Sequence, residues 1–214
     1  MGIPLLFQIL VLLFAVTVHE CAHGWMAYKC GDDTARNSGR LTLNPLAHID
    51  LFGTIMLPLL LVMMHSSFLF AWAKPVPINP TNFNNPKNDI MKVGASGPVS
   101  NLLLAVASTV FIWLFQTMKM PATDANIMVQ NMLVLSVYIN LILAVFNLVP
   151  IPPLDGSQIL TGLLTAKQQM LYEKISPFGM AIIILLMMSG FIDILIMPVV
   201  RFLQGILFWG LRSI

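Results

Sequence analysis

Residues 19–23 read His-Glu-Cys-Ala-His, which places two histidines four residues apart with a glutamate beside the first. On a helix this spacing puts both imidazoles on one face, where their ring nitrogens can share a metal ion. The glutamate then lies beside the ion and can act as a general base toward a metal-bound water. The pattern predicts a centre for metal-assisted hydrolysis, with His19 and His23 as metal ligands and Glu20 as the catalytic acid/base.

A catalytic zinc site usually has three protein ligands, so one more is needed. Asp155 is the preferred candidate, because it is the only acid near the end of the apolar segment 127–149 and the preceding prolines can turn its carboxylate inward. His48, Asp50 and His65 are weaker candidates. The polar loop around His48 and Asp50 favours a solvated or turn-stabilising role, and His65 is better explained by a hydrogen bond within its own segment.

Composition indicates where these residues must lie. The chain has 214 residues, of which 57% are hydrophobic and 9% charged, and its mean hydropathy is +0.84. Soluble domains contain about 25% charged residues, so this is an integral membrane protein. At about 20 residues per crossing, the length suits a single domain over residues 1–214 that forms one bundle of about four to six membrane segments. No basic run indicates a nucleic-acid partner.

Apolar runs and their interruptions predict the elements of an all-α, polytopic helix bundle. Residues 157–166 resemble a short interfacial helix, and Pro198 is expected to separate the last two apolar segments. The sequence shows no convincing cleavable signal peptide. The expected membrane segments are residues 3–28, 51–73, 93–118, 127–149, 178–197 and the short 199–214.

Between the first and third segments the sequence predicts short β-strands and a re-entrant element. Residues 39–43 alternate in polarity like a short strand. Residues 74–80 contain two prolines two positions apart, which predicts an edge strand whose remaining amides, at Val76 and Ile78, point to one side. Residues 81–92 are expected to form a polar loop.

The proposed ligands constrain the topology. If Asp155 joins the two histidines at one metal, the first and fourth segments end at the same depth, and the third runs in the opposite direction. Segment 51–73 must then re-enter, lie in the interface or cross twice. The positive-inside rule places its flanking loops, and therefore the active site, on the cytoplasmic side. The basic residues in these loops are Lys29, Arg36, Arg40, Lys74, Lys87, Lys92, Lys167 and Lys174.

Several motifs together resemble the site-2 protease family, the intramembrane zinc metalloproteases, and in particular its compact bacterial branch. Their order and spacing cover most of the chain up to residue 156. The matching elements are His19-Glu20-x-x-His23, Asn44-Pro45-x-x-His48-Ile49-Asp50, Lys74-Pro75-Val76-Pro77, Gly97-Pro98-x-x-Asn101 and Phe146-Asn147-x-x-Pro150-x-x-Pro153-Leu154-Asp155-Gly156.

The resemblance implies one zinc ion per chain, held by His19, His23 and Asp155, with Glu20 as acid/base and Asn147 positioning the substrate or an oxyanion. It implies regulated intramembrane proteolysis of single-pass membrane proteins in a bacterial plasma membrane. Some members carry a PDZ or CBS domain, and the length of this chain leaves room for neither. The helix that precedes the first motif in larger members is also expected to be absent.

Two other functions remain open at this stage. A relative that holds a membrane segment without cutting it is disfavoured, because all four chemical residues are present. A metal transporter would be expected to carry polar residues along a path through several segments, whereas the ionisable residues here cluster at one depth. Zinc uptake by vesicles would separate transport from proteolysis.

Three asparagines in apolar segments allow two interpretations. Each amide can donate to an oxyanion or to substrate backbone, or it can hydrogen-bond between helices. For Asn147 the two interpretations are balanced, whereas Asn101 and Asn140 favour the interhelical bond. A substrate must also unwind before it is cut, and we hypothesise that the strand near Val76 to Ile78, or the one near Leu41 to Leu43, pairs with it by strand addition.

Overall fold

The structure, a computed structural model, describes residues 3–56, 60, 63–64 and 72–210. Every regular element in these ranges is helical, which confirms the all-α class. Among the described residues, four helices have the length and composition to cross a membrane: α1 (Leu5–Lys29), α4 (Pro86–Thr117), α5 (Asp124–Asn147) and the stretch Ala166–Met188. That stretch comprises α7 (Ala166–Glu173), η4 (Ser176–Phe178) and α8 (Gly179–Met188). The other elements are α2 (Thr34–Asn37), η1 (Pro45–His48), η2 (Leu51–Met56), η3 (Pro80–Asn82), α6 (Asp155–Leu163) and α9 (Phe191–Trp209).

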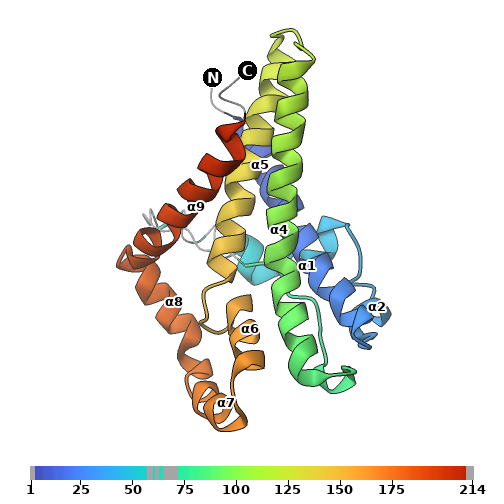
Figure 1. Ribbon diagram of the computed structural model, residues 1–214, viewed down its shortest axis with the longest axis vertical. Coiled ribbons are helices and arrows are strands. Elements are labelled where there is room, and N and C mark those ends of the chain that lie inside the picture. Colours follow the sequence, from blue (N-terminus) through green and yellow to red (C-terminus); the bar gives the residue numbers. More distant parts are fainter. Residues whose placement is uncertain (1–2, 57–59, 61–62, 65–71, 211–214) are drawn as a thin grey trace.

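Helix α4 lies at the centre and contacts α1, α5 and α6. Figure 1 shows α4 beside α5, with α6 below the end of α5. Ala15 of α1 is hydrogen-bonded to Asn101 of α4, whereas His23, further along α1, is bonded to Val93, which comes earlier in α4. The two helices are therefore antiparallel. The hydrogen bonds from Asn101 to Asn140 and between Ser108 and Ser136 show that α4 and α5 are also antiparallel. Helices α1 and α5 therefore point the same way, which is the predicted arrangement.

A compact apolar core joins α4, α5, α8 and α9. Val137 and Val200 are completely buried in it, whereas many large apolar side chains on the same helices face outward. Exposed apolar faces of this kind are expected where a helix meets lipid, because the bilayer core contains no water and apolar side chains are stable there without being buried in protein. The outward faces and the four candidate spans together indicate a multi-pass membrane protein.

The two ends of segment 51–73 meet, although most of its middle lies outside the described residues. The Lys74 amide donates to the His48 carbonyl at 2.9 Å, and the Trp72 amide donates to the Gly53 carbonyl at 3.2 Å. A single crossing would separate these ends by about 30 Å. The contacts therefore agree with the prediction that the segment does not cross once. The choice between re-entry, an interfacial position and two crossings, and a role in gating access, concerns residues that lie outside the described part.

The predicted β-strands are absent from the described residues. Residues 39–43 form turns and bends, and residues 72–79 are extended without a ladder. A strand needs a neighbouring strand to pair with, and here several backbone groups of the second stretch bond to side chains instead. Val76 donates to the Glu20 carboxylate, and Arg40 donates to the Lys74 carbonyl. The alternating pattern of residues 39–43 therefore predicted a strand wrongly, and the prolines of residues 74–80 predicted a sheet edge that is absent from the described residues.

Two helix boundaries also differ from prediction. Helix α4 begins at Pro86 and not near residue 93, because the Asn85 side chain caps it by accepting from the Asn88 amide and Pro86 suits the first helical position. The C-terminal break falls at Gly190, whose φ of 71° suits glycine, and not at Pro198, which lies inside α9. The predicted short helix at 157–166 is present as α6.

Candidate metal centre

Two buried histidines project from α1 toward α4. His19 and His23 are one helical turn apart and are 7% and 5% exposed. Gly97 on α4 packs directly against them, and a Cβ at this position would lie 2.4 Å from His23 Nε2. Only glycine allows α4 to approach the imidazoles this closely, which accounts for the small residues at the start of the third predicted segment.

The outer nitrogen of each imidazole is occupied by an oxygen acceptor. His19 Nδ1 lies 2.6 Å from Asn101 Oδ1, and His23 Nδ1 lies 2.7 Å from the Val93 carbonyl oxygen. Since a carbonyl oxygen only accepts, Nδ1 carries the proton in both rings and donates it. Both Nε2 atoms then present lone pairs to the interior, which is the tautomer that a metal-ligating histidine needs.

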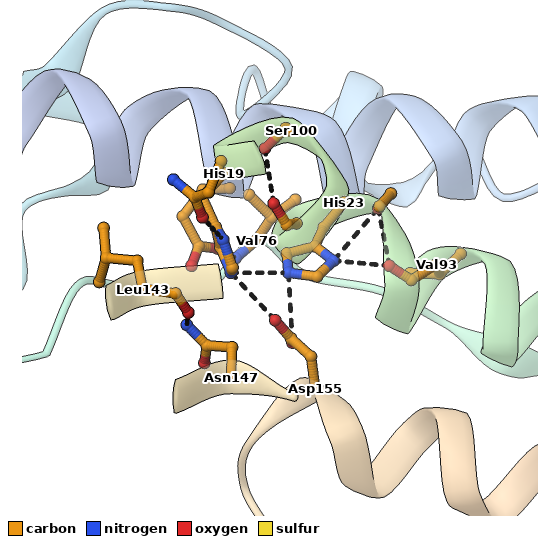
Figure 2. A network of polar contacts seen from close by, with 12 residues as sticks. His19, His23, Val76, Val93, Ser100, Leu143, Asn147 and Asp155 are labelled. Carbon is orange, nitrogen blue, oxygen red and sulfur yellow. Dashed lines mark hydrogen bonds and ion pairs between the residues drawn. The ribbon is translucent and has the colours of Figure 1, made fainter. Parts of the chain in front are cut away.

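Asp155, the first residue of α6, extends toward both histidines, as Figure 2 shows. Its Oδ2 lies 3.0 Å from His19 Nε2 and its Oδ1 lies 3.2 Å from His23 Nε2. Gly156 permits the tight turn that aims this carboxylate, because a Cβ there would lie 2.2 Å from the Leu148 carbonyl oxygen. The three residues singled out as metal ligands are therefore brought together from two distant helices.

These three side chains fit a metal ion. The two Nε2 atoms are 3.1 Å apart, and ligand atoms in a tetrahedral zinc site lie about 3.3 Å from one another. Asp155 Oδ2 is buried without a hydrogen-bond donor, since the nearest His19 nitrogen has no proton to give. Lone pairs that converge without a proton repel one another unless a cation lies between them. Within the described residues this is the only group of three such side chains close enough to share an ion.

Glu20 adjoins the group, and its carboxylate accepts a hydrogen bond of 2.9 Å from the Val76 amide. The strand-addition hypothesis required this amide to pair with a substrate, but its bond to Glu20 means that it is not free to do so. Pro75 and Pro77, on the opposite edge of the extended chain, have no amide to offer. The extended stretch 72–78 instead covers one side of the centre and fixes the orientation of the glutamate.

A cavity of about 440 Å³ opens onto these residues. Its walls come from α1, the stretch 72–78, α5, α6 and α8. Asn147 lines it, and the Asn147 side-chain nitrogen donates one hydrogen bond to the Leu143 carbonyl one turn back in α5 (Figure 2). Apart from the chemical residues, most of the lining is apolar: Val16, Trp72, Ala73, Pro75, Val76, Ile78, Leu143, Phe146, Pro153, Leu154, Met180 and Ile183.

The weaker ligand candidates do not join the centre. His48 Nε2 bonds to the Thr42 carbonyl at 2.9 Å, and the Asp50 carboxylate accepts from the Gly53 amide at the start of η2. Both therefore stabilise local turns, in agreement with the structural interpretation of these residues. His65 lies outside the described residues.

Asp32 anchors the residues that follow the stretch 72–78, which covers one side of the centre. Buried at the end of α1, it accepts hydrogen bonds from the Asn79 amide at 2.7 Å and from the Asn82 side chain at 2.8 Å, together with two from Thr34. Burial opposes its ionisation, but these hydrogen bonds outweigh burial and lower the pKa of Asp32 below its ordinary value. The anchor holds the stretch 72–78 against α1.

Sequence reasoning missed the roles of two groups that support the site. The Val93 carbonyl and the Val76 amide belong to the backbone, so their side chains carry no signal of these roles. Asn101 was considered as a substrate contact or as an interhelical bond, and the structure supports the second. Its side chain bonds to His19, to the Ala15 carbonyl and to Asn140. A buried amide four residues after Gly97 was the available signal.

Comparisons with known proteins identify relatives of this chain. The model of peptidase family M50 matches residues 114–190. A Bacillus subtilis (strain 168) protein provisionally named as the zinc metalloprotease YwhC is 35% identical over 189 residues, which span 86% of this chain and 80% of that protein. The provisionally named zinc metalloprotease Rip2 of Mycolicibacterium smegmatis is 25% identical over 177 residues, which span 83% and 64% of the two chains. No solved structure gives a significant match.

Proposed function

The chain belongs to peptidase family M50, the site-2 protease family of zinc metalloproteases, and on this basis we propose that it cleaves peptide bonds within or near transmembrane segments. The proposed substrates are single-pass membrane proteins, and the proposed setting is regulated intramembrane proteolysis. We assign one zinc ion per chain to His19, His23 and Asp155, catalysis to Glu20, and substrate or oxyanion positioning to Asn147.

One observation carries the proposal: three ligand atoms from α1 and α6 converge beside Glu20 in a cavity within the apolar part of the chain. A polar centre in a membrane segment is costly and usually has a function. The cavity walls are mainly apolar, so they suit the side chains of a membrane segment better than those of a soluble peptide. Because the main-chain groups of a helical substrate are hidden in its own hydrogen bonds, the substrate must be locally unwound where it enters.

The residues of the chain divide the chemistry between them. A bound zinc ion would polarise the scissile carbonyl and make a water molecule more acidic. Glu20 takes the proton of that water through its carboxylate and returns it to the leaving nitrogen. The Val76 amide holds the Glu20 carboxylate at 2.9 Å so that it does not rotate away. Asn147 offers its side-chain amide to the substrate from α5.

We place the protein in the plasma membrane of a bacterium with the centre toward the cytoplasmic side. The ends of α1 and α5 that bear the centre adjoin the loops rich in lysine and arginine, whereas the loop between α4 and α5 contains only Lys119. Basic loops are retained on the cytoplasmic side. The bilayer itself is therefore the second partner of the chain.

The decisive experiment compares the purified wild type with Glu20→Gln in liposomes. Zinc content is measured together with cleavage of a panel of single-pass membrane proteins. We expect both proteins to hold about one zinc ion and only the wild type to cut, because glutamine keeps the shape of the side chain but cannot take a proton. His19→Ala serves as the control that should lose zinc and cleavage together. Cleavage by Glu20→Gln at the wild-type rate would contradict the assigned role of Glu20.

A further inference from the structure

A continuous chain of buried hydrogen bonds leads away from the candidate metal centre into α5. His19 Nδ1 bonds to Asn101 Oδ1 at 2.6 Å, and Asn101 Nδ2 donates to Asn140 Oδ1 at 2.7 Å. Asn140 Nδ2 in turn donates to the Ser136 carbonyl oxygen at 2.9 Å. Asn101 and Asn140 are 0% and 1% exposed, so water does not compete for these groups.

The direction of every bond in this chain is set at its far end. The Ser136 carbonyl can only accept, so the nitrogen of Asn140 must face it and the oxygen of Asn140 must face Asn101. The nitrogen of Asn101 then faces Asn140, and the Ala15 carbonyl at 3.3 Å requires the same orientation. The oxygen of Asn101 is left for His19, which must carry its proton on Nδ1.

The opposite orientation is excluded at each link. If Asn101 turned its amide over, two oxygens would face each other toward Asn140, and the nitrogen of Asn101 would point at His19 Nδ1. His19 would then accept at Nδ1 and carry its proton on Nε2, so it could not ligate a metal through Nε2, the atom that faces His23 and Asp155. In a dry interior each such mismatch leaves a polar group unpaired, which is unfavourable because no water is present to replace the lost hydrogen bond.

We propose that Asn140 is a positioning residue of the metal centre, which acts through Asn101 to keep the Nε2 lone pair of His19 directed at the ion. This inference rests on the proposed zinc centre and adds to it a residue that touches neither metal nor substrate. His23 has its own partner in the Val93 carbonyl, so the asparagine chain serves His19 alone.

The test measures zinc affinity by competition with a chelator and records the absorption spectrum of the cobalt-substituted protein. In Asn140→Leu the side chain keeps its size but loses both polar ends, and we expect zinc affinity to fall about 10-fold, as is typical when a group that orients a ligand is removed. The cobalt spectrum should change toward that of a site with one fewer nitrogen ligand. Asn140→Ala makes the same test without adding apolar volume, in case the leucine variant does not fold.

A double variant separates this role from simple packing. In Asn101→Asp both side-chain oxygens accept, so His19 must carry its proton on Nδ1 whichever way the carboxylate turns. The combination of Asn101→Asp with Asn140→Leu should therefore regain the zinc affinity that Asn140→Leu loses. A residue that only packed α5 against α4 would not be compensated in this way.

Asn131→Leu is the matched control, because it makes the same substitution on the same helix outside this chain of bonds. Its zinc affinity should equal that of the wild type. Thermal stability in excess chelator is recorded for every variant. Unchanged zinc affinity in Asn140→Leu would overturn the inference, and so would a loss that the double variant does not restore. A wild type that binds no zinc would instead overturn the proposed metal centre itself.

Discussion

Gly97 determines how closely α4 approaches the two histidines. In Gly97→Ala the added Cβ would lie 2.4 Å from His23 Nε2 and 2.6 Å from His19 Nε2, which is closer than any stable contact. Either the imidazoles rotate or α4 moves away, and both responses separate the ligand atoms. We expect zinc affinity to fall at least about 10-fold, a loss of the size seen when ligands are no longer held in place. Chelator competition on the purified variant measures this.

The same substitution at Gly205 provides the control. This glycine lies in α9, and a Cβ there would have no atom within 4 Å. Gly205→Ala should leave zinc affinity unchanged and slightly raise thermal stability, because alanine is favoured over glycine in a helix by about 1 kcal/mol. Full zinc affinity in Gly97→Ala would mean that the close contact of α4 with the histidines is not needed for the centre.

At the scale of elements, the extended stretch 72–78 offers a test between two roles. Val76→Pro removes the amide that bonds to Glu20, and Val76→Ala retains it. Because a hydrogen bond to a charged group contributes about 1.5–3 kcal/mol, we expect Val76→Pro to slow cleavage of a membrane substrate about 10-fold or more at unchanged zinc content. Val76→Ala should cleave nearly normally.

Ile78→Pro distinguishes this role from pairing with a substrate strand. If the stretch bound substrates by strand addition, removing the Ile78 amide would impair cleavage as strongly as removing that of Val76. If the stretch acts through Glu20, only Val76→Pro should have the large effect. Equal losses in the two proline variants at full zinc content would restore the strand-addition hypothesis.

For the whole molecule, the contacts between the ends of segment 51–73 lead to a topology that labelling can test. Single cysteines replacing Arg36, Lys87 and Lys119 are introduced into a protein that carries Cys21→Ala and Cys30→Ala. Because α4 runs opposite to α1 and α5, positions 36 and 87 should react with an impermeant thiol reagent from one side and position 119 from the other.

The two sides are assigned by labelling intact cells and then inverted vesicles. The positive-inside rule predicts that positions 36 and 87 react only in the vesicles, where the cytoplasmic face is exposed. Reaction of position 36 and position 87 from opposite sides would contradict the topology. A fully denatured sample, in which all three cysteines react, controls for poor accessibility.

Much of the candidate site could be predicted from the sequence, because its chemistry depends on residue types at short spacing. Two histidines four apart lie on one helix face whatever surrounds them, and an acid after a proline-rich helix end has few other uses in an apolar chain. The membrane class and the boundaries of α1 and α5 also follow from local composition. The relative directions of the first, third and fourth segments were predictable once Asp155 was taken as the third ligand.

The remaining features depend on residues far apart in the chain. The pairing of His19 with Asn101 joins positions 82 residues apart, and the bond from Val76 to Glu20 spans 56 residues. No periodicity in the sequence specifies which helix faces will meet, and backbone donors are invisible to residue type. The sequence by itself therefore determined which residues are candidates for the ligands and the acid/base, and where the apolar helices lie. Only the tertiary structure decided that the extended stretch forms no sheet, that the last break falls at Gly190, and which buried partners orient the imidazoles, because these depend on packing between distant elements.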